Sequence, residues 1–265
     1  MINSMLVGAV GGAVGAAIGG LVAAGWRKVR KEEGRGSASV ATAVAFGCGL
    51  IGANFATALT KPTLEERFDA NPAIAALHQH FPAEYEKLMA DIKAIGLSDP
   101  AAVEVKVMST VTDVTSTHVG RLDDARARDT ILLAIEEAKL LRDHDPASCL
   151  AFFDGKPLGV PLSSLMSDDL RRRDLAHTAA VLTQVATRPA EPPSPLPQDQ
   201  AEQFVFAAAK KLSPEEQTAI RPVLIEGKQP ATAAELRAQC NFTINMMVEA
   251  VNGPPGTARS FLAQS

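Results

Sequence analysis

The chain has 265 residues, 46% of them hydrophobic and 21% charged, with a net charge of −4. Residues 61–265 alone carry 21 basic and 28 acidic side chains, which is a net charge of −7. This acidic balance argues against nucleic acid as a partner, because phosphate binding needs a basic face.

Two long runs of small and apolar residues, 5–26 and 37–59, contain no charged side chain. Each is long enough to cross a bilayer as a helix, which takes about 20 residues. We therefore expect a transmembrane helical hairpin over residues 1–60. The alternative is a helical hairpin buried in a soluble protein, because alanine and glycine make both runs only moderately apolar.

Small residues recur every four positions in both runs and would form ridges where helix backbones approach closely. The pattern resembles the glycine-zipper hairpins of bacterial envelope proteins over residues 5–59. The resemblance implies an envelope location and self-association into a homo-oligomer. Many such proteins are lipid-anchored, but this chain lacks the lipid-accepting cysteine. The packing residues we expect are Gly8, Gly11, Gly12, Gly15, Gly19, Gly20, Ala45, Gly49 and Ala53.

The connector between the two runs carries five basic side chains, from Arg27 to Arg35. By the positive-inside rule the connector lies in the cytoplasm, so residues 61–265 lie outside it. In a Gram-negative cell this places the hairpin in the inner membrane and the rest of the chain in the periplasm.

Residues 61–265 are expected to be all-α. Proline at helix starts and glycine after helix ends mark the boundaries. The residues 100–142 are rich in Val and Thr, so a strand is an alternative for their first half. We favour helix because Val103, Val107, Val111 and Val114 form one stripe at helical spacing. The expected helices are 72–81, 82–95, 100–142 with a bend at Gly120, 145–153, 162–187, 199–212, 214–226 and 231–251, with one last turn over 257–265.

The segment 188–198 contains five prolines in eleven residues and is the one clear linker. Proline-rich chain favours an extended polyproline II conformation and excludes a helix. The linker either separates two subdomains or reverses the chain across one helical bundle. Further along, Pro222 is expected to kink or end the helix that contains it.

Two of the three cysteines, Cys149 and Cys240, lie in apolar helical segments of the soluble part, whereas Cys48 lies in the second run. Outside the cytoplasm a Cys149–Cys240 disulfide is the natural expectation, and two buried free thiols are the alternative. The soluble part resembles only uncharacterised membrane-anchored helical proteins of proteobacteria with two cysteines. That resemblance implies no activity.

No catalytic, nucleotide-binding or metal-binding motif stands out, and no cofactor is expected. His78 and His80 are two positions apart, so a helix turns them to different faces, and His177 is expected to be a packed histidine. The arginines 171–173 are flanked by acidic residues, which favours a solvated mixed-charge face over an anion site. The leading hypothesis is therefore a non-enzymatic envelope protein with another envelope protein as partner. The alternatives are an oligomeric channel or pore and an enzyme with an unrecognised site.

Replacing Gly12 and Gly15 with leucine is expected to weaken the hairpin or its oligomer, because large side chains push the helices apart. Chemical crosslinking of the protein in membranes and in detergent measures the effect. Unchanged crosslinking would show that these glycines pack against nothing.

Overall fold

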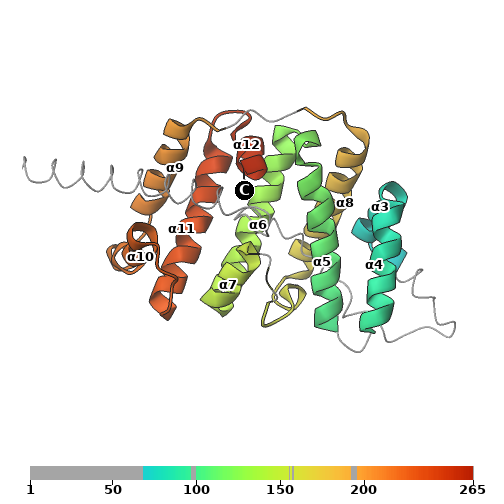
Figure 1. Ribbon diagram of the computed structural model, residues 1–265, viewed down its shortest axis with the longest axis horizontal. Coiled ribbons are helices and arrows are strands. Elements are labelled where there is room, and N and C mark those ends of the chain that lie inside the picture. Colours follow the sequence, from blue (N-terminus) through green and yellow to red (C-terminus); the bar gives the residue numbers. More distant parts are fainter. Residues whose placement is uncertain (1–67, 97–99, 155, 157, 192–195, 265) are drawn as a thin grey trace, which may run out of the picture. The chain divides into compact units, whose positions relative to one another are not determined.

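The computed structural model describes residues 68–96, 100–154, 156, 158–191 and 196–264. These residues form ten α-helices and no strand, so the predicted all-α fold is confirmed for this part of the chain (Figure 1). The two predicted membrane helices and their small-residue ridges lie outside the described residues. None of the described helices has the combination of length and apolar sequence that a membrane span requires.

The described residues divide into two compact units. We call residues 68–196 with 250–264 the main unit, and residues 197–249 the inserted unit. One division falls after Leu196, within the proline-rich segment, and the other falls after Glu249.

The main unit is built around α8, which packs against α3, α5, α6 and the short 3-10 turn η1. Helix α4 packs against α3 and α5, while α7 and α12 pack against α6. The elements of the main unit are α3 (Pro72–His80), α4 (Pro82–Ile95), α5 (Pro100–Thr117), η1 (Val119–Arg121), α6 (Asp124–His144), α7 (Pro146–Phe153), η2 (Leu162–Ser164), α8 (Asp168–Thr187) and α12 (Thr257–Gln264).

Several helices begin where the sequence predicts, at a capping residue followed by proline. The Asn71 side chain accepts hydrogen bonds from the N–H groups of Ala73 and Ile74 at the start of α3. Asp145 caps α7 in the same way. Each side chain supplies acceptors for N–H groups that have no partner inside the helix.

The valine-rich segment is helical, as predicted, because its stripe of valines is buried. Val103, Val107 and Val111 are completely inaccessible to solvent, and Val114 is nearly so. The segment 100–142 is interrupted around Gly120, where a bend was expected, but the interruption separates two helices. Helix α5 ends at Thr117, and α6 starts afresh at Asp124 because the Asp123 side chain caps it.

The predicted helix 162–187 also starts later than expected. Residues 162–164 form the 3-10 turn η2, and α8 begins at Asp168 with Ser167 as its cap. The Ser167 hydroxyl accepts a hydrogen bond from the Leu170 N–H at 3.2 Å. A serine cap commits the preceding residues to a turn, so the helix cannot extend back to residue 162.

The inserted unit contains α9 (Gln198–Lys210), α10 (Pro214–Glu226) and α11 (Ala233–Asn252), the last of which continues past Glu249. A capping box between Ser213 and Glu216 starts α10. Pro222 was expected to kink or end its helix. It does not end the helix, because α10 continues to Glu226. One apolar cluster of the unit contains the buried residues Leu212, Ile220 and Ala238, with Ala219, Val223, Leu224 and Phe242 packed around them.

Cys149 on α7 and Cys240 on α11 are both completely buried, and both are disulfide-bonded. We expect the bond predicted from the sequence, Cys149 to Cys240, in the isolated protein. Closing a loop of about 90 residues contributes about 4–5 kcal/mol to the free energy of unfolding in the chain-entropy model.

Thiol labelling of denatured, unreduced protein is therefore expected to find one free cysteine, Cys48. Reduction should release two more thiols and lower the melting temperature. A Cys48→Ala variant serves as the control, because it should show no free thiol before reduction. Three free thiols in freshly purified wild-type protein would contradict the bond.

Candidate functional site

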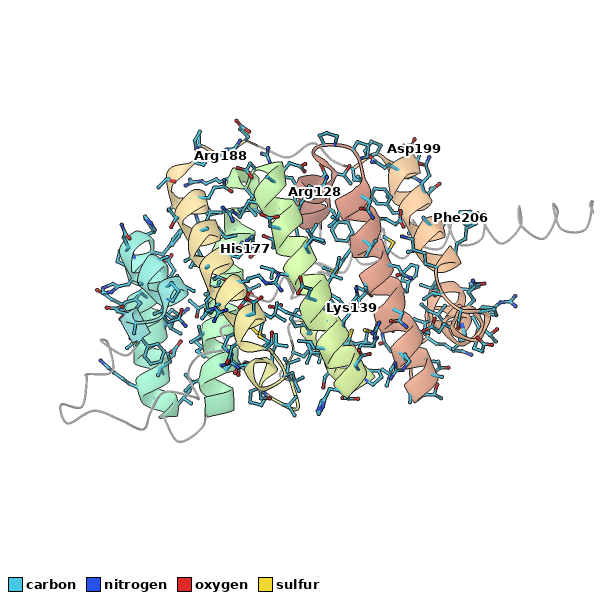
Figure 2. The ribbon with its side chains drawn as sticks, turned by 180° about the vertical axis from the view of Figure 1, so that it is seen from behind. Arg128, Lys139, His177, Arg188, Asp199 and Phe206 are labelled. Atoms are coloured by element: carbon cyan, nitrogen blue, oxygen red, sulfur yellow. The ribbon has the colours of Figure 1, made fainter. Side chains whose placement is uncertain are left out.

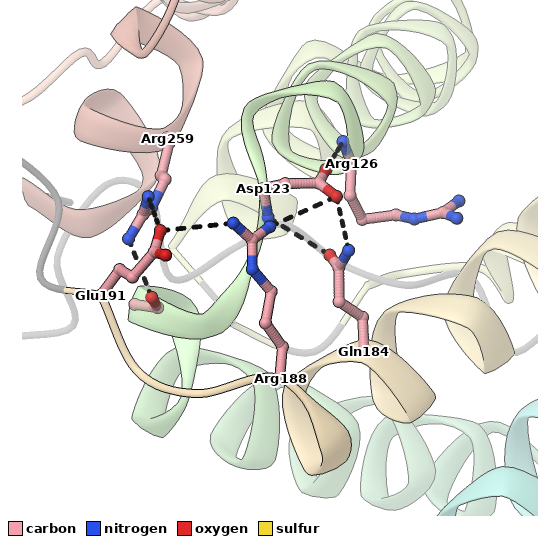
Figure 3. Close-up of polar contacts among 7 residues, drawn as sticks. Asp123, Arg126, Gln184, Arg188, Glu191 and Arg259 are labelled. Carbon is pink, nitrogen blue, oxygen red and sulfur yellow. Dashed lines mark hydrogen bonds and ion pairs between the residues drawn. The ribbon is translucent and has the colours of Figure 1, made fainter.

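Polar side chains gather at one end of the main unit, where η1, the start of α6, the end of α8 and α12 lie together (Figure 3). We call this group the terminal polar cluster. It contains the backbone carbonyl of Gly120, the backbone N–H of Arg126 and the side chains of Asp123, Gln184, Arg188, Glu191 and Arg259.

Asp123 is the centre of one half of this cluster. Its carboxylate accepts hydrogen bonds from the Arg126 backbone N–H at 2.8 Å and from Gln184 Nε2 at 2.6 Å. The Gln184 carbonyl in turn accepts the Asp123 backbone N–H at 3.3 Å. The hydrogen bond from the Arg126 N–H lowers the pKa of Asp123, and the Gln184 hydrogen bond adds to this effect. Asp123 thus caps α6 and binds the last turns of α8.

The Gly120 carbonyl is the centre of the other half. It accepts the Glu191 backbone N–H at 3.0 Å and Arg259 Nη2 at 2.9 Å. The Glu191 carboxylate lies 3.4 Å from Arg259 Nη1 and accepts a hydrogen bond from Arg188 Nη2 at 3.2 Å. Arg188 Nη1 also lies 3.4 Å from the Asp123 carboxylate, so it joins the two halves.

A second arginine satisfies a carbonyl close to the end of α8. Arg121 Nη1 donates to the Val185 carbonyl at 3.0 Å. The last carbonyls of a helix have no partner within it and carry partial negative charge, so a guanidinium there is favourable. The arginines at this end of the main unit therefore stabilise helix ends and the turn η1 through contacts with carbonyls and carboxylates.

His177 lies on α8 and is packed against α6 (Figure 2). Its Nε2 lies 2.7 Å from Thr130 Oγ1, and its Nδ1 lies 3.4 Å from Arg126 Nη1. The Thr130 hydroxyl donates its own proton to the Arg126 carbonyl at 2.8 Å, so it must accept from His177 Nε2–H. Nδ1 is then the acceptor for the guanidinium, which assigns a neutral imidazole with its proton on Nε2.

Burial and the nearby guanidinium both favour this neutral form. Burial lowers the pKa of His177 to about 4, with a further contribution from the positive charge of Arg126. Two buried carboxyl groups lie on the same pair of helices, Glu137 on α6 and Asp174 on α8. The prediction that His177 is a packed histidine is confirmed, since only 7% of it is exposed.

A third polar group joins α5 to the turn before α8. The largely buried Glu104 carboxylate accepts a hydrogen bond from the Ser163 hydroxyl at 2.9 Å, and burial raises the pKa of Glu104 above its ordinary value. Arg171 Nη2 donates to the carbonyls of Ser163 and Met166.

A hydroxyl beside a carboxylate is also the beginning of a nucleophile–base pair. Here, however, the Glu104 carboxylate also accepts the backbone N–H groups of Leu162 and Ser163, which lie in η2. Arg171 holds the carbonyls of the same turn. We therefore assign these contacts to the anchoring of η2, a role that could not be predicted from the sequence.

The His78 side chain has two partners that were not identified from the sequence. His78 Nδ1 lies 3.1 Å from Oδ1 of Asp69, which is nine positions earlier in the sequence. The His78 ring also stacks on the ring of Tyr85. Within the described ranges, no three His, Cys, Asp or Glu side chains are placed to hold one metal ion.

The arginine block is a mixed-charge surface, as predicted, for two of its three members. Arg172 and Arg173 are paired with Asp169, and Arg173 also binds Glu136 on α6. Arg171 differs, because its side chain is only 19% exposed and holds the turn before α8.

Searches for related proteins give no functional assignment. The sequence matches no protein-family model, and no characterised protein or solved structure is significantly similar to it.

The His177 site makes stability depend on pH. The histidine has an ordinary pKa of about 6.5 when unfolded but about 4 when folded, so the unfolded chain binds its proton more readily between these values. Stability is therefore fully present above pH 6.5 and falls as the pH drops towards 4. Between pH 7.5 and 5 the expected loss is about 2 kcal/mol.

Urea unfolding followed by circular dichroism at both pH values measures this loss. His177→Gln should lose about 2 kcal/mol less than the wild-type protein over the same interval. The control is His144→Gln, on an exposed histidine at the end of α6, which should behave like the wild type. Equal pH dependence in His177→Gln and the wild type would show that His177 is not held in the neutral form.

Proposed function

We propose that the protein is a non-enzymatic, membrane-anchored protein of the bacterial envelope that presents its helical part outside the cytoplasm as an interaction domain. The observation that carries the proposal is the pair of uncharged runs, 5–26 and 37–59, around a basic connector. Their length favours membrane spans, and the connector's charge favours the inner membrane with residues 61–265 in the periplasm.

The contacts within the main unit are consistent with an interaction role. The buried side chains of Glu104 and His177 are hydrogen-bonded to other elements of the fold. Arg188 and Arg259 of the terminal polar cluster, and Arg121 beside it, likewise contact carbonyls and carboxylates. Groups engaged in this way stabilise a scaffold, and a scaffold attached to a membrane is suited to binding another protein.

The proposed partners follow from the same features. The small-residue ridges of the two runs favour association with further copies of the chain in the membrane. The soluble part, with a net charge of −7, is proposed to bind another envelope protein and not nucleic acid.

Topology is the most direct test. Alkaline phosphatase is active only outside the cytoplasm, so a fusion after Ser265 should be active and a fusion at Gly34 should be inactive. Enzyme activity in intact cells, normalised to the amount of fusion protein, gives the measurement. The reverse pattern would exclude the proposed orientation, and two inactive fusions would exclude export.

The control varies the charge that sets the orientation. Replacing Arg27, Lys28, Arg30 and Lys31 with glutamate removes most of the positive charge of the connector and should reduce activity of the fusion after Ser265. If orientation depends on the connector, the phosphatase activities of the two fusions of this variant become more similar.

A conductance measurement on the purified protein in bilayers separates an anchor from a pore, because only a pore passes ions.

A further inference from the structure

The inserted unit is attached to the main unit through two segments of chain. The chain leaves the main unit after Leu196 and re-enters it at Ala250. The outgoing segment follows α8 and contains Arg188 and Glu191, and the returning segment ends in α12, which contains Arg259.

Both segments are held by one atom, the carbonyl oxygen of Gly120. The outgoing segment donates the Glu191 backbone N–H to it at 3.0 Å, and the returning segment donates Arg259 Nη2 at 2.9 Å. A carbonyl oxygen has two lone pairs and can accept both. The two donors are also joined to each other, because Arg259 Nη1 lies 3.4 Å from the Glu191 carboxylate (Figure 3).

The exposure of the two partners favours a contact that opens reversibly. The Arg259 side chain is only 15% exposed, whereas that of Glu191 is 58% exposed. Ion pairs with one partner in water are weak, so Glu191 can exchange this contact for water at little cost. Breaking the hydrogen bond from the Arg259 guanidinium to Gly120 costs more free energy, because this bond is charge-assisted and largely sheltered from solvent.

Helix α12 is short enough to depend on this contact. It has eight residues, and isolated helices of that length do not form in water. The apolar side chains that α12 buries in the main unit include Ala258 and Leu262. The hydrogen bond from Arg259 to Gly120 connects α12 to η1, in addition to the packing of α12 against α6.

We propose that Gly120, Glu191 and Arg259 form a latch that couples α12 to the segment by which the chain leaves the main unit. In the closed state both segments are bonded to Gly120 and to each other. Opening at either segment breaks the ion pair between Arg259 and Glu191 and so weakens the anchoring of the other. The two effects are equal, because coupling between two sites is reciprocal. The latch is a conformational device of the main unit, and it does not depend on the membrane-anchoring proposal.

Amide hydrogen exchange of the full chain, with peptides covering residues 185–191 and 257–264, tests the coupling. In Glu191→Gln the α12 amides should exchange several-fold faster, although Glu191 is not part of that helix. In Arg259→Gln the amide of Glu191 should exchange roughly tenfold faster, as expected when a charge-assisted hydrogen bond is lost.

The matched control is Arg172→Gln, which removes an exposed arginine–aspartate pair on α8 and should leave both peptides unchanged. If Arg259→Gln raises hydrogen exchange throughout the protein, the Glu191→Gln variant alone tests the latch, because the exposed Glu191 contributes little to overall stability. Wild-type exchange of α12 in Glu191→Gln would overturn the latch. An increase confined to the substituted segment in both variants would overturn it as well.

Discussion

The main unit depends on one constraint, which is that the ends of its helices must find hydrogen-bond partners. Each helix leaves about four N–H groups and four carbonyls without partners inside it, and a bundle of short helices has many such ends. At the starts of helices these groups are satisfied by short polar side chains, such as Asn71, Asp123 and Asp145. Close to the other ends, Arg121 and Arg259 donate to carbonyls of neighbouring elements. The same bonds that satisfy helix ends therefore also connect the helices to one another.

Hydrogen-bond partners are also required by the ionisable side chains in the interior of the main unit. A buried polar group is costly unless it is hydrogen-bonded, so each must be placed against a specific partner. His177 meets the condition as a neutral ring between Thr130 and Arg126. Glu104 meets it by accepting hydrogen bonds from the turn before α8. Such contacts favour one relative placement of α5, α6 and α8.

Local signals in the sequence predict most of the described helices, whereas contacts between distant residues remain hidden. Asn71-Pro72 and Asp145-Pro146 mark helix starts because the cap and the proline act within three residues. The buried valines of α5 are predictable for a similar reason, since their spacing alone defines a face. The late start of α8 was not predicted, because the sequence LSSLMS of residues 162–167 is compatible with a helix. Ser167 is also compatible with a position on the exposed face of a helix. The contacts that join different elements in the terminal polar cluster could not be predicted, because these partners are separated by about 60 to 140 positions.

The sharing of one carbonyl by two distant segments has a consequence for the order in which the protein is built. Gly120 and Arg259 are 139 positions apart, and the whole inserted unit is synthesised between Glu191 and Arg259. While the ribosome makes α9, α10 and α11, the Glu191 carboxylate lacks the guanidinium of Arg259 because that residue does not yet exist. Contacts of such long sequence separation form late, since closing a long loop is entropically costly. The growing chain therefore passes through a stage in which the first six helices of the main unit are complete, but their terminal polar cluster still lacks its last arginine.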